Sequence, residues 1–234
     1  MDKQLTEEIK VAEPKNHSVL VACLVAQQEP WLQRFLDCLT KLDYPQDAIR
    51  HAFVEGKNVP LLHQWTKANT WIKEVNPPIA DRFERLAYLR NLLVDEAHPI
   101  GGEDYILWID SDVVDFPPSL IKDLMKHNVQ VVAPSVWIEG TQQFYDTLAF
   151  RNIYGQRIPA WDIPYKGFME MGSVGCVYMV AARLYSQSKI RYHGGDSEQV
   201  KFCEAVRQKG EKVYADFDIH VQHANLPWYG KTWH

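Results

Sequence analysis

The chain has 234 residues and a mass of 27.1 kDa, which is enough for one substantial α/β domain. Hydrophobic residues make up 46% and charged residues 24% of the sequence, close to the average of globular proteins, which excludes a disordered or low-complexity chain. The 25 Lys and Arg against 30 Asp and Glu give a formal charge of -5 and provide no basic field for a nucleic-acid backbone. We therefore expect a folded protein that does not bind nucleic acid.

The four cysteines are widely separated and show neither the short spacings of a zinc site nor a secreted disulfide framework. We expect them to be reduced and mostly buried. Residues 1–16 have mixed charge and predict a polar N-terminal tail, and residues 17–234 predict a single domain. The sequence contains no secretory signal pattern and no run of 18 apolar residues, so we expect no membrane span and a cytoplasmic location.

The first 58 residues predict a β-α-β unit. Residues 18–25 form a Val-rich apolar run typical of a strand buried on both faces, and Pro30 suits the first position of the helix that follows. A second strand is expected over residues 49–54, ending in the turn-forming residues 55–58. This order implies two parallel strands joined by a right-handed crossover.

The rest of the chain continues the α/β alternation. Residues 60–80 are expected to be a loop with some helix. Asp81 precedes a helix whose apolar face is formed by Phe83, Leu86, Leu89, Leu93 and Ala97, with Arg82, Arg85 and Arg90 on other faces. The further predicted elements are strands over 105–109, 129–133, 172–181 and 213–221, and helices over 117–125 and 197–208.

Two aspartates, Asp110 and Asp112, directly follow the apolar strand 105–109. Ligands of open α/β sheets bind at the carboxyl ends of strands, and two carboxylates there suit Mg²⁺ or Mn²⁺ with positions left for diphosphate oxygens. The alternative is that these residues form the turn and cap the helix that follows Pro117. The second pair, Asp216 and Asp218, lies inside an alternating strand and is expected on one solvated face.

His223 is the candidate third ligand, because an imidazole at the end of the last strand can complete a coordination sphere begun by carboxylates. His220 is a competing choice. Packing or surface exposure is the other interpretation of either histidine.

Further candidates follow from their positions at strand and helix ends. Glu55 suits hydrogen bonds to a nucleobase or ribose, or is a solvated turn residue. Arg85 and Arg90 are candidates to neutralise a diphosphate, or are surface charges. We also count Gln27, after the first strand, and Ser111, between the two aspartates, among the donor-binding candidates.

The acidic loop that opens the helix over 197–208 contains Asp196 and Glu198, either of which is a candidate to take a proton from an acceptor hydroxyl. Helix capping explains the same residues. Several aromatic residues in predicted loops can stack on the apolar faces of sugars or fill the core, among them Trp137, Tyr145, Trp161 and Tyr165.

The sequence resembles known glycosyltransferases at several motifs. Residues 19–22, 39–45 and 53–58 resemble the first half of enzymes with the GT-A fold. Residues 105–121 (YILWIDSDVVDFPPSLI), with 131–137 (VVAPSVW) and Tyr145-Asp146, resemble the fungal mannan polymerase family of mannosyltransferases, glycosyltransferase family 62, and related glycosyltransferase domains of giant viruses. The resemblance covers roughly residues 18–224.

The resemblance implies an α/β GT-A fold, a mostly parallel sheet flanked by helices. It implies that Asp110 and Asp112 bind the metal together with His223, that Glu55 lies where the nucleoside is read, and that Arg90 matches an Arg-Asn pair before the metal strand. Asp196 and Glu198 match the acidic loop that meets the acceptor. The cofactor is then Mn²⁺ or Mg²⁺.

The function expected from these observations is the transfer of a hexose or deoxyhexose, mannose- or rhamnose-like, from a GDP- or UDP-sugar to a hydroxyl of a glycan or glycoprotein, with retention of configuration. Two alternatives are a phosphohydrolase of the haloacid dehalogenase type and a non-catalytic sugar-binding domain. The identities of the sugar, the base and the acceptor stay open, as does the oligomeric state.

Overall fold

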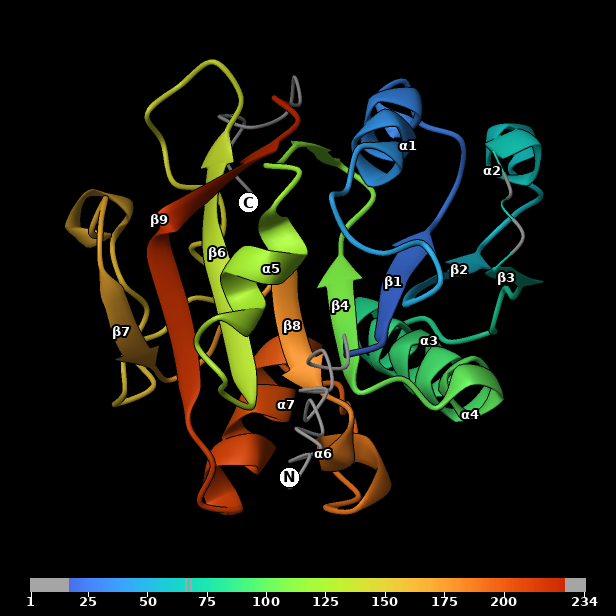
Figure 1. Ribbon diagram of the computed structural model, residues 1–234. Helices are drawn as coiled ribbons and strands as arrows, with labels where there is room; N and C mark the ends of the chain where they lie inside the picture. The colour runs from blue at the N-terminus through green and yellow to red at the C-terminus, as the bar shows by residue number, and fades with distance from the viewer. Residues whose placement is uncertain (1–16, 66, 68, 226–234) are drawn as a thin grey trace, which may run out of the picture.

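We describe the fold from a computed structural model, which describes residues 17–65, 67 and 69–225. The predicted polar tail, residues 1–16, lies outside the described residues. The described chain forms one α/β unit in which helices cover both faces of a nine-stranded sheet (Figure 1). This arrangement agrees with the predicted fold class.

The sheet has the strand order β3-β2-β1-β4-β8-β6-β9-β5, and β7 pairs with β9 beside this path. The strands are β1 (Val19–Val25), β2 (Ile49–Glu55), β3 (Thr70–Glu74), β4 (Tyr105–Ile109), β5 (Val113–Asp115), β6 (Val131–Ile138), β7 (Phe168–Met171), β8 (Val177–Ala181) and β9 (Val213–His223).

One half of the sheet, β3-β2-β1-β4, is entirely parallel, and its two central strands, β2 and β1, are buried almost throughout. β8 runs antiparallel to both β4 and β6, and β9 runs parallel to β6. β4, β6 and β9 therefore point the same way, so their carboxyl ends lie at the same edge of the sheet, at the top of Figure 1.

Two apolar layers hold the helices against the sheet. α1 and α5 pack on one face, where Phe35, Leu36 and Leu124 are almost fully buried, and α3 and α7 pack on the other, with Leu93 and Phe202. The helices are α1 (Leu32–Thr40), α2 (Pro60–Trp65), α3 (Arg82–Glu96), α4 (His98–Gly101), α5 (Leu120–Met125), α6 (Arg183–Ser186), α7 (Glu198–Gln208) and the 3₁₀ turn η1 (Ala160–Asp162).

Three short strands were not expected from the sequence. β3 lies in the segment 60–80, where some helix is confirmed by α2 but a strand was missed, because its residues are only half-buried and lack alternation. β5 and β7 have three and four residues, too few for a pattern. The strand expected over 172–181 begins only at Val177, because the residues before it turn, with Cys176 at a φ of 55°.

The last two long strands differ from their predicted bounds. β6 continues past Pro134 to Ile138, and β9 continues to His223. The register between them shifts after Pro134, which faces Asp216, so that Ser135 already faces His220. β9 thus has a bulge opposite Pro134, where the proline cannot donate a ladder hydrogen bond. The bulge breaks the alternation that the sequence predicted for β9.

The buried face of α3 differs from the apolar face that the sequence predicted. Asp81, which the sequence placed directly before this helix, caps it by accepting a hydrogen bond from the Glu84 amide. Phe83, Leu86 and Leu89 are only half-buried, whereas Arg90 is 2% exposed and lies on the buried side with Leu93 and its neighbours. The prediction that Arg90 lies on an outer face was wrong, because arginine is rarely buried unless its charge is paired, and the sequence did not show the partners.

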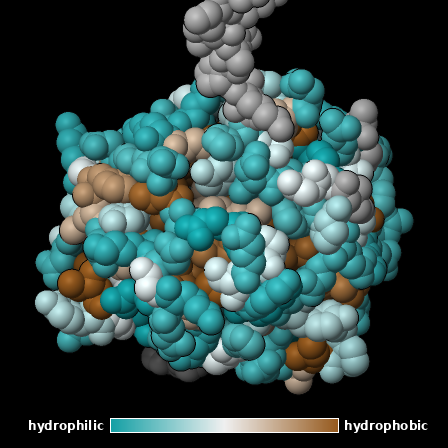
Figure 2. All heavy atoms as spheres, turned by 60° about the horizontal axis from the view of Figure 1, so that its bottom comes forward, coloured by the Kyte–Doolittle hydropathy of each residue, from teal (hydrophilic) through white to brown (hydrophobic). Residues whose placement is uncertain are grey.

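Cys23, Cys176 and Cys203 are buried and Cys38 is half-buried, all as free thiols, which confirms the prediction for the cysteines. Among the described helices, none has the length and apolar character needed to span a membrane. Figure 2 shows the face at the amino-terminal end of β4, where hydrophilic residues predominate and apolar residues form separate small patches.

Candidate functional site

The candidate site is formed at the carboxyl end of β4, where Asp110 and Asp112 follow the strand. β5 begins immediately afterwards and pairs with the end of β9, with Val113 opposite His223. The amide of Ala224 also donates a hydrogen bond to the Asp112 carbonyl. These backbone contacts place the Asp112 Oδ2 atom 2.9 Å from Nε2 of His223.

The His223 ring is fixed from two sides. It is fully buried, it stacks on Tyr145 with 3.6 Å between the ring centroids, and its Nδ1 lies 2.9 Å from the Ala224 carbonyl oxygen. A donor proton on Nδ1 directs Nε2 towards Asp112. Burial opposes protonation of the ring, but the hydrogen bond and the charge of Asp112 outweigh it, so the pKa of His223 is raised. His220 lies elsewhere, with its Nε2 near the Phe217 carbonyl oxygen.

Asp110 is tied to Arg90 instead. A guanidinium nitrogen of Arg90 donates to Asp110 Oδ1 at 3.1 Å, and its Nε donates to Glu198 Oε1 at 3.1 Å. Burial raises the pKa of Asp110 to about 6; Arg90 opposes this shift, whereas the charges of Asp112 and Glu198 add to it. Arg90 thus joins the metal-ligand candidate Asp110 to the acceptor-loop candidate Glu198.

The position of Arg90 is set by aromatic rings beneath the site. Its guanidinium carbon lies 4.8 Å from the Trp108 ring centroid and 5.8 Å from that of Tyr192. Tyr192 in turn shares hydroxyl hydrogen bonds with Tyr178 and Tyr185. A cation held between two carboxylates and two aromatic faces has little freedom to move, so Arg90 defines where Asp110 lies.

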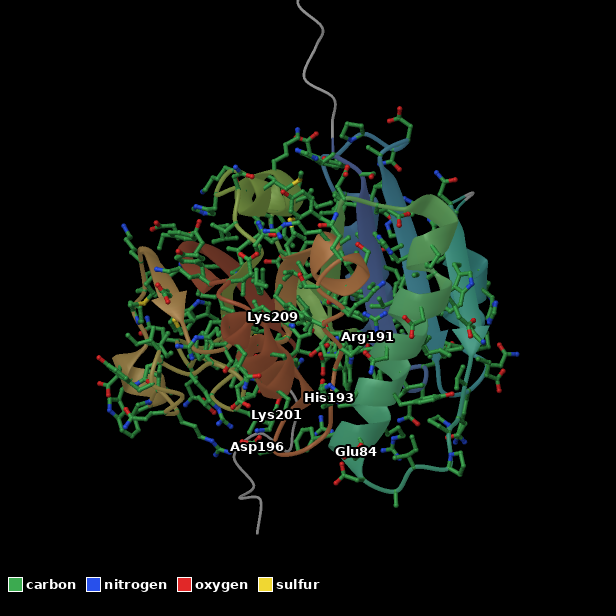
Figure 3. All side chains as sticks on the ribbon, turned by 90° about the horizontal axis from the view of Figure 1, so that it is seen from below. Glu84, Arg191, His193, Asp196, Lys201 and Lys209 are labelled. Atoms are coloured by element: carbon green, nitrogen blue, oxygen red, sulfur yellow. The ribbon has the colours of Figure 1, made fainter. Side chains whose placement is uncertain are left out.

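Asp196 and Glu198 are separated by their environments. Glu198, the first residue of α7, is 1% exposed and paired with Arg90. Asp196 lies at the surface beside Lys201 in Figure 3 and forms an ion pair of 2.5 Å with Arg151, which lowers its pKa. Neither caps α7 through its side chain, because Ser197 is the N-cap residue.

Glu55 is buried rather than solvated, since β2 extends to include it. One carboxylate oxygen accepts a hydrogen bond from the Val59 amide, and the other lies 2.7 Å from Nε2 of His63. Glu55 and His63 both line a cavity of about 600 Å³. Its lining residues come from the end of β2, the loop after it, α2 and β3: Glu55, Asn58, Pro60, His63, Gln64, Ile72 and Glu74.

The remaining predicted donor-binding residues are less constrained. Gln27 is exposed, with its side-chain amide donating to Glu29. Ser111 is half-buried between the two aspartates. Arg85 is half-buried on the first turn of α3, where its guanidinium donates to the Ile79 carbonyl at 3.3 Å. The roles of these three residues stay predictions.

Asp146 is a further candidate, which the sequence marks only as part of the Tyr145-Asp146 motif. It is 7% exposed; its Oδ1 accepts a hydrogen bond from the Ala149 amide, and its Oδ2 has no hydrogen-bond partner among the described residues. Burial raises the pKa of Asp146 to about 7, and the charges of Asp110 and Glu198 add to this shift while the Ala149 amide and His223 oppose it. In the sequence, only its place after Tyr145 in the Tyr145-Asp146 motif pointed to this residue. In the structure, Tyr145 stacks on His223.

The second aspartate pair is not on one solvated face. Asp216 is 2% exposed, 2.6 Å from Nε2 of His127 and 3.4 Å from Nζ of Lys126, whereas Asp218 is exposed. The bulge in β9 separates the two side chains. Asp216 therefore has a structural role in joining β9 to the end of α5.

The donor set fits a divalent cation in its chemistry. Carboxylates and an oriented imidazole are ligands that Mn²⁺ accepts, and the buried ring of His223 is held as a ligating histidine requires. Within the described residues, however, no group of three or more His, Cys, Asp or Glu is already arranged to hold a metal ion. Asp112 and His223 are together, and Asp110 is held by Arg90.

The sequence matches a family model and resembles parts of larger proteins. A model of the family described as Anp1 matches residues 78–157, which include α3, the two aspartates and Asp146. Procollagen-lysine,2-oxoglutarate 5-dioxygenase 2 of Homo sapiens is 29% identical over 167 residues, covering 63% of this chain and 22% of that protein. The multifunctional procollagen lysine hydroxylase and glycosyltransferase LH3 of Rattus norvegicus is 24% identical over 218 residues, 82% of this chain and 28% of that protein. The chain spans about a quarter of the length of these relatives.

Solved structures show the same architecture. TarS of S. aureus in complex with UDP-GlcNAc superposes with a TM-score of 0.63 at 13% identity, over 89% of this chain and 59% of that chain. GalNAc-T7 with UDP, GalNAc and Mn²⁺ superposes with a TM-score of 0.60 at 13% identity, over 89% of this chain and 43% of that chain. The chain therefore has the fold of the GT-A glycosyltransferases.

Proposed function

We propose that this chain is a metal-dependent glycosyltransferase. It moves a hexose or deoxyhexose from a GDP- or UDP-sugar to a hydroxyl group of a glycan or glycoprotein, with retention of configuration. The observation that carries this proposal is the meeting of Asp112 and His223 at the carboxyl end of β4, with Asp110 beside them. Two carboxylates and one imidazole at this edge of an α/β sheet suit a metal-bound diphosphate.

The comparisons support the reaction class. The rat relative has glycosyltransferase in its name, and the two solved structures contain UDP-GlcNAc or UDP with GalNAc and Mn²⁺. The Anp1 match includes the aspartates. We do not propose the dioxygenase activity that some of these relatives are named for, because this chain covers about a quarter of their length and has the transferase fold.

Asp110, Asp112 and His223 would hold the cation. When bound, such a cation supplies a Lewis acid that stabilises the charge developing on the diphosphate leaving group. Arg90 holds Asp110 in place from the buried side, with Glu198 as its second partner. It is a positioning residue, because both of its observed charged contacts are to carboxylates of this chain.

The nucleoside is proposed to occupy the cavity at the ends of β2 and β3. Val25 at the end of β1 pairs with Glu55, and β1 also pairs with β4, so this cavity opens at the same edge as the aspartates. Glu55 fixes the turn at Val59 and the ring of His63. Its proposed contribution is therefore to shape the cavity through His63 as well as to accept hydrogen bonds itself.

Asp146 is the carboxylate best suited to face the acceptor hydroxyl. Asp196 and Glu198 each form an ion pair with an arginine, whereas no ion pair involves Asp146 in the described structure, and its buried Oδ2 accepts no hydrogen bond there. We propose that Oδ2 accepts the hydrogen bond of the attacking hydroxyl and so orients its oxygen towards the sugar carbon. With retention, the hydroxyl proton leaves on the departing phosphate, so Asp146 need not take it.

The non-enzymatic alternative and the phosphohydrolase alternative are tested by the same experiment. Calorimetric titration of GDP and UDP into the chain is carried out with and without Mn²⁺, followed by assays of donor hydrolysis with GDP-mannose and UDP-glucose. We expect metal-dependent binding of at least one nucleotide and slow hydrolysis of the matching donor. Cleavage of p-nitrophenyl phosphate would favour the phosphohydrolase.

The decisive variant is Asp112→Asn, which removes one ligand charge and keeps the side-chain volume. Its matched control is Asp47→Asn, an exposed aspartate of the loop before β2. The proposal requires that metal-dependent nucleotide binding is weakened about tenfold or more in Asp112→Asn and is unchanged in Asp47→Asn. Metal-independent binding of equal strength in both variants would contradict it.

A further inference from the structure

A cavity of about 560 Å³ lies along β9, apart from the nucleoside cavity. β9 pairs with β7 through residues 213–216 and with β5 through residues 222–223. Between these two pairings, in the described structure, residues 217–221 have no partner strand on that edge. We call the resulting cavity the β9 notch; it is lined by Asp115, Phe116, Pro117, Pro118, Asp123, Lys126, Asp218, Ile219 and His220.

Aromatic rings continue the wall of the β9 notch through His220. The ring centroid of His220 lies 4.4 Å from that of Tyr165 and 5.8 Å from that of Trp137, and these two rings are 5.2 Å apart. Tyr165 is 59% exposed. Of the seven large hydrophobic side chains that are exposed in the described residues, six lie between residues 153 and 169, the segment that contains Tyr165. Tyr165 is the exposed aromatic residue of this segment that contacts His220 in the wall of the notch.

The charge of the β9 notch restricts its occupant. Three carboxylates, those of Asp115, Asp123 and Asp218, face a single amine, that of Lys126, which also lies 3.4 Å from Asp216. This excess of negative charge disfavours a phosphate-bearing ligand such as the donor. None of these carboxylates belongs to a three-residue metal cluster in the described structure. Carboxylates next to exposed aromatic rings instead suit a neutral ligand with many hydroxyl groups and an apolar face, which is a sugar.

The β9 notch is also continuous with the proposed catalytic edge. β5 leads directly from Asp112 to Asp115, and three strand residues span about 10 Å. On the opposite strand, His220 and His223 are likewise three residues apart in β9. A saccharide chain with its reacting hydroxyl near Asp112 can therefore extend into the notch.

We propose that the β9 notch is a binding site for a neutral sugar unit of the acceptor, one or two units away from the hydroxyl that reacts. The assignment of this sugar to an acceptor rests on the proposed function, whereas the binding of a saccharide in the notch does not require catalysis. Asp218 and Asp115 accept hydrogen bonds from sugar hydroxyls, and Tyr165 packs on the apolar face of the ring.

The test uses saturation-transfer NMR and titration with three neutral trisaccharides, mannotriose, maltotriose and chitotriose, without donor or metal. Tyr165→Ala removes the exposed ring, and its control is Tyr154→Ala, which removes a ring that is 80% exposed in the same segment. Asp218→Asn removes the carboxylate charge, and its control is the exposed Asp47→Asn. We expect at least one trisaccharide to bind, with a dissociation constant raised about five- to tenfold by each notch variant and unchanged in each control.

The proposal is overturned if none of the three trisaccharides binds, or if the notch variants bind as tightly as the controls. In the transferase assay, the notch variants should raise the acceptor KM and leave donor hydrolysis unchanged. Saccharide binding without nucleotide binding would refute the proposed function and keep the notch assignment, whereas nucleotide binding without saccharide binding would do the reverse.

Discussion

Asp112 Oδ2 lies 2.9 Å from Nε2 of His223, although two further strands, β8 and β6, separate β4 from β9 in the sheet. The contact exists because the short strand β5 folds back from Asp112 and pairs with the end of β9, where Val113 faces His223. Three residues of strand therefore bring the ends of two distant strands together.

Asp112 and His223 should behave as one unit in metal binding. We predict that Asp112→Asn and His223→Gln each weaken Mn²⁺-dependent nucleotide binding by about 10- to 100-fold, because each removes a ligand. The double variant should lose much less than the sum of the two effects. Calorimetry at fixed Mn²⁺ gives the three numbers, and strict additivity would show that the two side chains act independently.

Tyr145 should matter through the ring it supports. Tyr145→Leu removes the face that stacks on His223 at 3.6 Å and leaves a buried ring free to tilt. We predict an apparent Mn²⁺ affinity about tenfold weaker, with nucleotide affinity at saturating Mn²⁺ restored. Tyr154→Leu, at an exposed tyrosine, is the matched control. An unchanged Mn²⁺ dependence would mean that His223 needs no support from Tyr145.

Arg90 should be intolerant even of lysine, because one ammonium group cannot reproduce the two directed contacts to Asp110 and Glu198. We predict that Arg90→Lys lowers kcat at saturating donor and raises the Mn²⁺ concentration needed for half activity. Arg90→Gln should also destabilise the fold by about 3 to 5 kcal/mol, since Glu198 is then a buried charge without its partner. Urea unfolding measures this loss, and wild-type stability in Arg90→Gln would refute the buried ion pair.

Asp146→Asn should increase stability while reducing activity. The pKa of Asp146 is raised to about 7 in the folded chain, so the unfolded state releases this proton at lower pH than the folded state does. The wild type therefore loses stability as pH rises from about 4 to about 7, by up to about 4 kcal/mol, and this penalty persists at higher pH. Asparagine carries no charge and removes the penalty.

The expected result is that Asp146→Asn unfolds at higher urea than the wild type at pH 8 and at similar urea near pH 4. Its transfer rate should fall while nucleotide binding is kept, because the acceptor hydroxyl loses its charged partner. Equal stability of the two proteins at pH 8 would show that burial does not raise the pKa of Asp146.

The sequence by itself determined the α/β class, the parallel β-α-β start and the position of Asp110 and Asp112 at a strand end. These features depend on local patterns: apolar runs long enough to read, helix starts such as Asp81, and chain order. The position of His223 at the end of the last strand was predicted for the same reason, from the alternating pattern that precedes it.

Only the tertiary structure decided which charged groups meet. It buried Arg90 between Asp110 and Glu198, paired Asp196 with Arg151, left Asp146 Oδ2 without a partner in the described structure, and hid Asp216 against His127. These outcomes depend on strand order, on a bulge and on contacts between distant segments. A sequence pattern marks a residue as charged, but the energy of that charge is set by the neighbours that the fold brings to it.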